Sequence, residues 1–153
     1  MLRTQKTIKV VICNQYALFR DGIKALFEHQ GPIKIVAEAA TGQEAIDHVE
    51  RLKPDVVLLD VELPDLSGFA TMHRMLEIDP DVKVLILTLS KNHRTQIARC
   101  LESGAAGHIK RHDRRAELEA LIPVVASRRR TLTTGRKSAL PAGSLLAARR
   151  LTA

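Results

Sequence analysis

Five short apolar runs alternate with amphipathic segments, and this alternation restricts the fold more than any other feature of the chain. The runs are five to seven residues long and lie at residues 8–13, 34–39, 55–60, 82–88 and 106–110. The segments between and after them repeat apolar residues at helical spacing, which predicts helices at 17–30, 42–52, 69–78, 94–103 and 115–127. Strands that alternate with helices of this length indicate a parallel sheet with helices on both faces. The predicted fold class is therefore α/β, a three-layer sandwich with a five-stranded parallel sheet.

The first predicted helix has a well-defined apolar stripe. Its members follow helical spacing, and Gly31 and Pro32 end the pattern; they are Leu18, Phe19, Ile23, Leu26 and Phe27. We expect this stripe to pack against the sheet.

Charge divides the chain into two parts. Residues 128–153 hold seven of the 24 basic residues and none of the 17 acidic ones, so residues 1–127 are neutral overall. We predict one folded domain at 1–127 and a basic linker or tail at 128–153. Such a tail either stays solvated, which is the more common behaviour of a charge run, or contacts nucleic acid.

Cysteine content and hydropathy indicate the compartment. Cys13 and Cys100 are the only cysteines, which implies no disulfide framework and favours a reducing cytoplasm. No apolar run is long enough to cross a bilayer, so no membrane association is expected.

Asp60 is the strongest candidate for a functional residue. It ends an almost continuously apolar run, and in a parallel α/β sheet the working site lies beyond the carboxyl ends of the strands. A carboxylate there can attack a phosphoryl group and form an acyl phosphate, although the same position also suits a loop or helix-capping aspartate. The segment after the first run, CNQYALFRDG, has no glycine-rich phosphate loop, which disfavours a nucleotide-dependent enzyme, and no enzymatic activity is expected.

Four stretches carry a family resemblance, in the order VVICNQYALFRDGIKALF, PDVVLLDVELPDLSG, VLILTLS and ESGAAGHIKR. They resemble the successive motifs of response-regulator receiver domains, above all the subfamily that has a LuxR-type helix-turn-helix behind the receiver. The resemblance covers about residues 7–127 and implies a flavodoxin-like (βα)5 fold in two-component signalling. The terminal ARRLTA resembles the linker into such an output domain, so we expect residues 128–153 to lead to a DNA-binding domain absent from this chain.

The resemblance assigns roles to individual residues. It places the phosphoacceptor at Asp60 and the switch hydroxyl at Thr88, both of which the family requires. Asn14 and Gln15 occupy the positions of the family's acidic pair, so both of those carboxylates are missing. Three further positions complete the pocket: Arg111 replaces the family's lysine, His108 replaces the switch aromatic, and Glu62 supplies the metal-ligating backbone carbonyl. Lys110 lies one position too early and should point the other way on strand alternation.

These departures predict a degenerate pocket. Mg²⁺ prefers anionic oxygen ligands, and here Asp60 is the one carboxylate left from the family set, with the Glu62 side chain as a weak substitute. An ion pair between Asp60 and Arg111 would satisfy the carboxylate without metal and lower its pKa. We therefore expect weak or no Mg²⁺ binding and slow or no phosphorylation. The alternative is that the amide oxygens of Asn14 and Gln15 still hold the metal.

Four histidines, His29, His48, His73 and His93, lack metal-ligand spacing and are expected to be solvated; His108 and His112 are expected at the surface, with pH sensing as the alternative.

Three functions stay open: a receiver that regulates transcription with little or no Mg²⁺-dependent phosphorylation, a conventional receiver phosphorylated on Asp60 by a sensor histidine kinase, and a flavodoxin-like sensor of a small molecule. A homodimer is expected, because such regulators meet paired DNA half-sites through their output domain.

Overall fold

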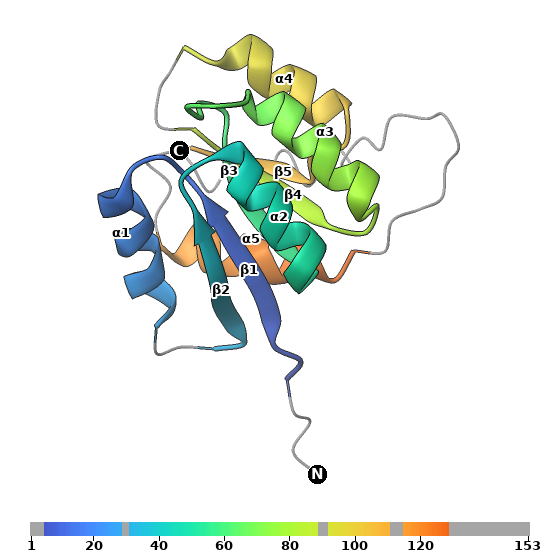
Figure 1. The fold of residues 1–153 in the computed structure, drawn as a ribbon. Helices are drawn as coiled ribbons and strands as arrows, with labels where there is room; N and C mark the ends of the chain where they lie inside the picture. The colour runs from blue at the N-terminus through green and yellow to red at the C-terminus, as the bar shows by residue number, and fades with distance from the viewer. Residues whose placement is uncertain (1–4, 29–30, 89–91, 111–114, 129–153) are drawn as a thin grey trace.

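The structure is a computed structural model that describes residues 5–28, 31–88, 92–110 and 115–128. Five parallel strands form one sheet in the order β2-β1-β3-β4-β5 (Figure 1). Their bounds are β1 (Ile8–Cys13), β2 (Ile33–Ala39), β3 (Val56–Asp60), β4 (Lys83–Thr88) and β5 (Gly107–Lys110). Each strand is followed by a helix: α1 (Ala17–Phe27), α2 (Gly42–Leu52), α3 (Gly68–Ile78), α4 (Arg94–Glu102) and α5 (Arg115–Ala126). The predicted α/β class with a flavodoxin-like (βα)5 arrangement is confirmed.

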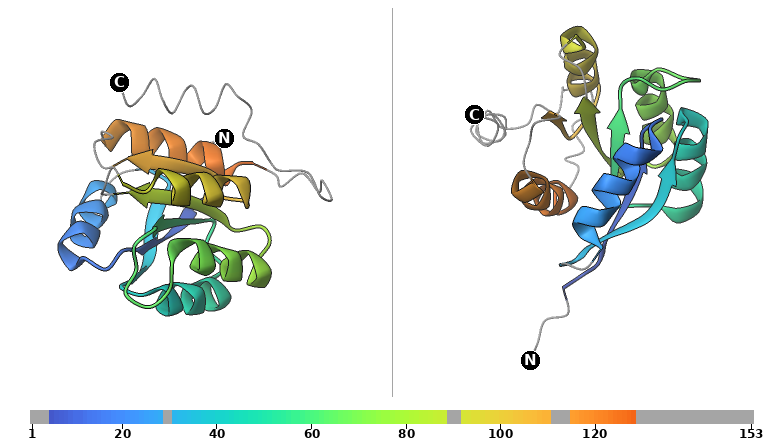
Figure 2. Two further views of the ribbon diagram at one scale, coloured as in Figure 1. Left: turned by 90° about the horizontal axis from the view of Figure 1, so that it is seen from above. Right: turned by 90° about the vertical axis from the view of Figure 1, so that its left-hand side faces the viewer.

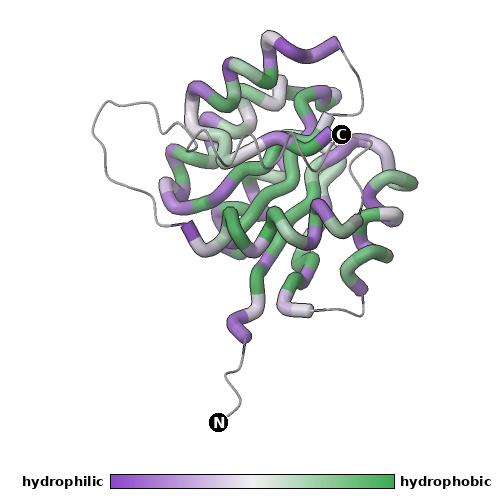
Figure 3. Tube along the Cα trace, turned by 180° about the vertical axis from the view of Figure 1, so that it is seen from behind, coloured by the Kyte–Doolittle hydropathy of each residue, from purple (hydrophilic) through white to green (hydrophobic). Residues whose placement is uncertain are grey.

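The sheet separates two hydrophobic cores. Successive side chains of a strand point to opposite faces, so Val57 of β3 packs in a cluster with residues of α2, α3 and α4, whereas Leu58 packs in a cluster with residues of α1 and α5. Figure 2 shows these two helix layers on opposite sides of the sheet. The hydrophobic stretches in Figure 3 run through the central strands, which accounts for their nearly continuous apolar sequences.

Helix caps fix the elements that surround the carboxyl edge of the sheet. Thr41 begins α2 with a side-chain oxygen that accepts from the backbone N–H of Glu44, and Ser67 begins α3 in the same way with Ala70. α2 ends at Leu52, and the next residue, Lys53, caps it with a φ of 46° in the left-handed region. The start of each of these helices is therefore set by local hydrogen bonds.

The first helix differs from its prediction in two respects. It ends at Phe27, and residues 29 and 30 lie outside the described residues. Leu18 is 85% exposed, so the prediction that it packs against the sheet is wrong, although Ile23 and Phe27 are buried. Leu18 is the second residue of α1, and consecutive helical residues are rotated by about 100° around the helix axis. Phe19 therefore packs on the core while Leu18 faces solvent. Within the described part of the chain, no helix is long and apolar enough to span a membrane.

Candidate functional site

Asp60 is the last residue of β3, and its residue surface is only 3% exposed. Both of its carboxylate oxygens accept hydrogen bonds: Oδ2 from the side-chain Nδ2 of Asn14 at 3.0 Å, and Oδ1 from the backbone N–H of Glu62 at 3.2 Å. Burial of a carboxylate is costly unless it is hydrogen-bonded. These two donors therefore make the position tolerable without a cation.

Asn14 follows β1 directly and is fully buried. Its side-chain oxygen accepts from the backbone N–H of Tyr16 at 2.8 Å, which is a local turn interaction typical of asparagine. Its side-chain nitrogen is thereby directed at Asp60. Its backbone is held as well, because its N–H donates to Ala39 and its carbonyl accepts from Arg20. The orientation of the Asn14 amide is thus fixed from both ends.

Gln15 lies next to Asn14 and contacts the loop after β3. Its side-chain Nε2 donates to the backbone carbonyl of Glu62 at 3.4 Å. The Glu62 side chain is engaged elsewhere, since its Oε1 lies 2.7 Å from Nε2 of His93. The prediction that His93 is a solvated residue is wrong: its side chain is 12% exposed, because the start of α4 covers this loop.

Burial raises the pKa of the Asp60 carboxyl above its usual range, and the nearby Glu62 charge adds to this, while the backbone N–H groups of Glu62 and Val61 oppose it. The predicted ion pair with Arg111 implies the opposite direction, and that direction is wrong because desolvation dominates around Asp60. The ion pair itself stays a prediction. Arg111 and His112 lie outside the described residues.

Thr88, the last residue of β4, and His108, near the start of the neighbouring strand β5, contact each other. Thr88 is 4% exposed, and its Oγ1 lies 2.8 Å from Nε2 of His108. Burial, together with the charge of Lys110, lowers the pKa of His108 to about 4. The expectation that His108 is a surface residue is therefore wrong, since β5 turns its ring inward beside Thr88. Lys110 is exposed; its orientation relative to Arg111 stays a prediction, because Arg111 lies outside the described residues.

The loop after β3 is anchored to α2 by a contact that the sequence did not suggest. The carboxylate of Asp65 accepts from the backbone N–H groups of Gly42 at 2.8 Å and Gln43 at 2.9 Å. Desolvation alone would raise the pKa of Asp65, but these N–H groups hold it below the ordinary value. The loop that carries Glu62 is thus held at one end by Asp60 and further along by the amino terminus of α2.

A model of the response regulator receiver domain family matches residues 10–123. The chain belongs to this family. The Transcriptional regulatory protein DegU of Brevibacillus brevis is 32% identical to this receiver domain over 123 residues, which are 80% of this chain and 51% of that protein. Response regulator GacA of Pseudomonas syringae is 32% identical over 126 residues, 82% of this chain and 58% of that protein.

A solved structure supports the same assignment. The signal receiver domain of the response regulator NarL from Mycobacterium tuberculosis matches with a TM-score of 0.72 and 25% identity, over 80% of this chain and 99% of that one. The chain spans about half the length of the curated relatives it matches.

Receiver domains of this family bind Mg²⁺ in general, so the donor atoms of this receiver decide whether the metal fits. The amides of Asn14 and Gln15 present nitrogen, not oxygen, to Asp60 and to the Glu62 carbonyl. Among the residues that the structure describes, no three His, Cys, Asp or Glu side chains gather into a metal-binding group. Asn14 and Gln15 therefore place amide donors, not oxygen ligands, at two of the acceptors that a hard divalent cation would use.

Proposed function

We propose that this receiver domain belongs to a transcriptional regulator of the two-component type and that it works with weak or no Mg²⁺-dependent phosphorylation of Asp60. The observation that carries the proposal is the hydrogen bond from the Asn14 amide to Asp60 at 3.0 Å. The Asn14 amide occupies one side of the Asp60 carboxylate, and a metal ion bound to the same oxygen would have to share that side. The pocket is satisfied internally, so a metal must first displace the amide.

The second amide supports the same proposal. Gln15 donates to the backbone carbonyl of Glu62, which is the carbonyl that the family resemblance assigns to the metal. His93 pairs with the Glu62 carboxylate, so this side chain is not turned toward Asp60. Three oxygen atoms that a metal would recruit, from Asp60, the Glu62 backbone and the Glu62 side chain, therefore have other partners.

The transcriptional role rests on the relatives. DegU is named as a transcriptional regulatory protein and GacA as a response regulator, and both extend well beyond the region matched here. In our proposal, DNA is contacted through an output domain of the LuxR type outside this chain, and residues 128–153 act as its linker. A homodimer and a cytoplasmic location are part of the same proposal, whereas a sensor histidine kinase is the partner that the conventional receiver would need; free, buried Cys13 and Cys100 are compatible with a reducing compartment.

The test is a calorimetric titration with Mg²⁺ in the presence of beryllofluoride, a mimic of the phosphoryl group. The wild-type domain should give no saturable binding up to about 10 mM Mg²⁺, and mass spectrometry should find little or no phosphate on Asp60 after incubation with acetyl phosphate. Saturable binding at about 1 mM or below, with phosphate on Asp60, would overturn the proposal in favour of a conventional receiver. The double variant Asn14→Asp/Gln15→Asp is the matched positive control and should gain binding.

A further inference from the structure

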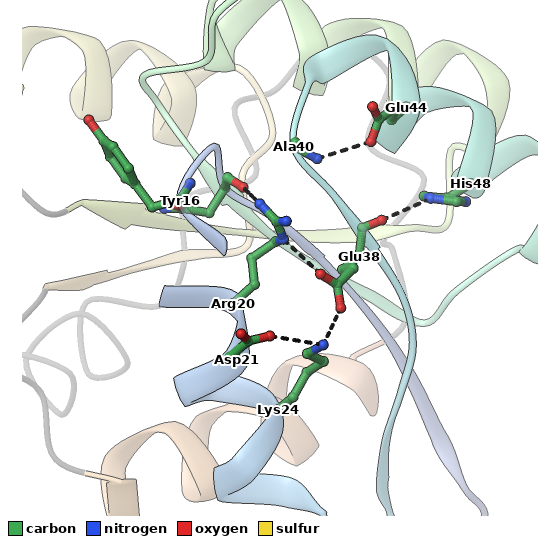
Figure 4. A network of polar contacts seen from close by, with 9 residues as sticks. Tyr16, Arg20, Asp21, Lys24, Glu38, Ala40, Glu44 and His48 are labelled. Carbon is green, nitrogen blue, oxygen red and sulfur yellow. Dashed lines mark hydrogen bonds and ion pairs between the residues drawn. The ribbon is translucent and has the colours of Figure 1, made fainter. Parts of the chain in front are cut away.

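We propose that Arg20 is a positioning residue for the pocket: it fixes the turn after β1 so that the Asn14 amide points at Asp60. The inference rests on the proposed function, because it explains how the internally satisfied pocket is maintained. Arg20 lies in the first turn of α1, and its side chain is only 12% exposed. Its Nη1 donates to the backbone carbonyl of Asn14 at 2.7 Å, and its Nε lies 2.9 Å from Oε1 of Glu38 (Figure 4).

The carbonyl of Asn14 needs a donor from outside the sheet. Asn14 lies one residue past the end of β1, where the strand pairing with β2 and β3 stops, and it is fully buried. A buried carbonyl without a partner is unfavourable, and a guanidinium provides a charge-assisted bond. Arg20 therefore stabilises the backbone conformation in which the Asn14 side chain bonds both Tyr16 and Asp60.

Glu38 keeps the guanidinium in place. Its second carboxylate oxygen pairs with Lys24, one turn along α1 from Arg20, and the pKa of Glu38 is lowered by its contacts with Lys24 and Arg20. The backbone around Glu38 is itself held by α2, because His48 bonds the Glu38 carbonyl at 3.1 Å and Glu44 accepts from the N–H of Ala40 at 3.1 Å (Figure 4). The carboxylate that anchors Arg20 is thus carried by a β2 backbone that α2 holds in place.

The geometry requires an arginine. Two nitrogen atoms of one planar group contact two different acceptors, the Asn14 carbonyl and the Glu38 carboxylate. A lysine has a single ammonium nitrogen and cannot reproduce this fork. A continuous chain of hydrogen bonds runs from Glu38 through Arg20 and Asn14 to Asp60. A substitution of Arg20 should therefore weaken the hydrogen bond from Asn14 to the Asp60 carboxylate, although Arg20 and Asp60 are not in contact.

The experiment measures hydrogen exchange of the Asn14 side-chain amide by NMR in the metal-free domain, with the backbone amide of Leu58 in the core of β3 as internal reference. Arg20→Gln should speed exchange of the Asn14 amide about tenfold or more relative to Leu58, as expected for the loss of a charge-assisted bond. Arg20→Lys should recover only part of the protection. Arg74→Gln, which removes an exposed arginine of α3 that contacts the Gln43 side chain, is the matched control and should leave the Asn14 amide unchanged.

Glu38→Gln provides a milder second variant if Arg20→Gln does not fold, and it should speed the same exchange by a smaller factor. If Arg20→Gln or, in its place, Glu38→Gln changes Asn14 and Leu58 equally, or neither, Arg20 has a general structural role and the inference fails. This outcome is independent of the magnesium titration, because the exchange experiment contains no metal. Tight Mg²⁺ binding by the wild type would overturn the proposed function even if Arg20 still positions Asn14.

Discussion

The side-chain hydroxyl of Thr88 and Nε2 of His108 lie 2.8 Å apart, joining the end of β4 to the beginning of β5. The resemblance to receiver domains assigns switch roles to both positions, and here the two side chains are partners of each other in a largely buried setting. The hydroxyl of Thr88 is therefore engaged on the side of β5. The contact also places a titratable ring where protonation is unfavourable.

The free energy of unfolding should depend on the protonation of His108. Burial lowers the pKa of His108 from its ordinary value of 6.5 to about 4 in the folded domain. Above pH 6.5 the ring is neutral in both states and its contribution to stability is complete. As the pH falls from 6.5 to about 4, the unfolded chain binds a proton that the folded domain does not, so stability is lost. Because the ring keeps some solvent access, we expect a loss of roughly 1–2 kcal/mol, measured by urea denaturation at several pH values.

Two variants separate this effect from other acid-sensitive groups. His108→Phe should flatten the stability profile between pH 6.5 and 4, because the titrating ring is gone. Thr88→Val should lower stability by roughly 1 kcal/mol at every pH while keeping the slope, because His108 remains. An identical slope in the wild type and His108→Phe would contradict the prediction.

The double variant Asn14→Asp/Gln15→Asp should be less stable than the wild type without metal and should be stabilised by Mg²⁺. Asn14→Asp removes the donor to Asp60 and places a second carboxylate beside a buried one, so without metal we expect a loss of about 1–3 kcal/mol at neutral pH. Mg²⁺ at ten times its dissociation constant should return about 1.4 kcal/mol by mass action. Thermal unfolding with Mg²⁺ and with EDTA measures both changes. The wild type should show no difference between the two solutions, and a double variant equally insensitive to Mg²⁺ would argue against this account of the pocket.

The sequence predicted the elements and most of the pocket because both follow from one rule. The carboxyl ends of parallel strands meet at one edge of the sheet. Asn14, which follows β1, and Asp60, which ends β3, can therefore be placed together from the sequence alone. The sheet order then brought these positions into contact as expected.

The remaining features depend on contacts that leave no local pattern. Asp65 bonds Gly42 across 23 residues, and the neighbouring residues of Asp65 give no sign of it. His93 is only partly exposed, because at the start of α4 its ring meets the Glu62 carboxylate, and the position of His93 in the sequence gives no sign of that contact. The direction of the Asp60 pKa was wrong for a related reason: the ion pair was inferred from one residue type, whereas desolvation depends on the whole surrounding structure.

Removal of the Asp65 carboxylate should loosen the loop after β3. Asp65→Ala deletes an acceptor of two backbone N–H groups at the amino terminus of α2, so we expect a loss of about 1 kcal/mol, the usual cost of a lost helix cap. Asp47→Ala is the matched control, because Asp47 is exposed on the same helix and its carboxylate accepts from the Gln43 side chain; its effect should stay within about 0.5 kcal/mol. Urea denaturation of the three proteins decides the matter, and equal losses in both variants would show that Asp65 has no special role.

Two glycine-to-alanine substitutions should have opposite signs. A Cβ at Gly68, the first residue of α3, would lie 2.6 Å from the Val61 Cα and 2.8 Å from the Asp60 carbonyl oxygen, so the helix must move away from the backbone that carries the phosphoacceptor position. Overpacking against backbone should cost roughly 1–3 kcal/mol. Gly22 lies within α1 with nothing within 4 Å of an added Cβ, so Gly22→Ala should stabilise the domain by up to about 1 kcal/mol through helix propensity. Chemical denaturation measures the sign of the change in stability for each variant. In NMR spectra the chemical shifts of the Asn14 side-chain amide should change in Gly68→Ala alone, because only that variant pushes on the backbone of Asp60.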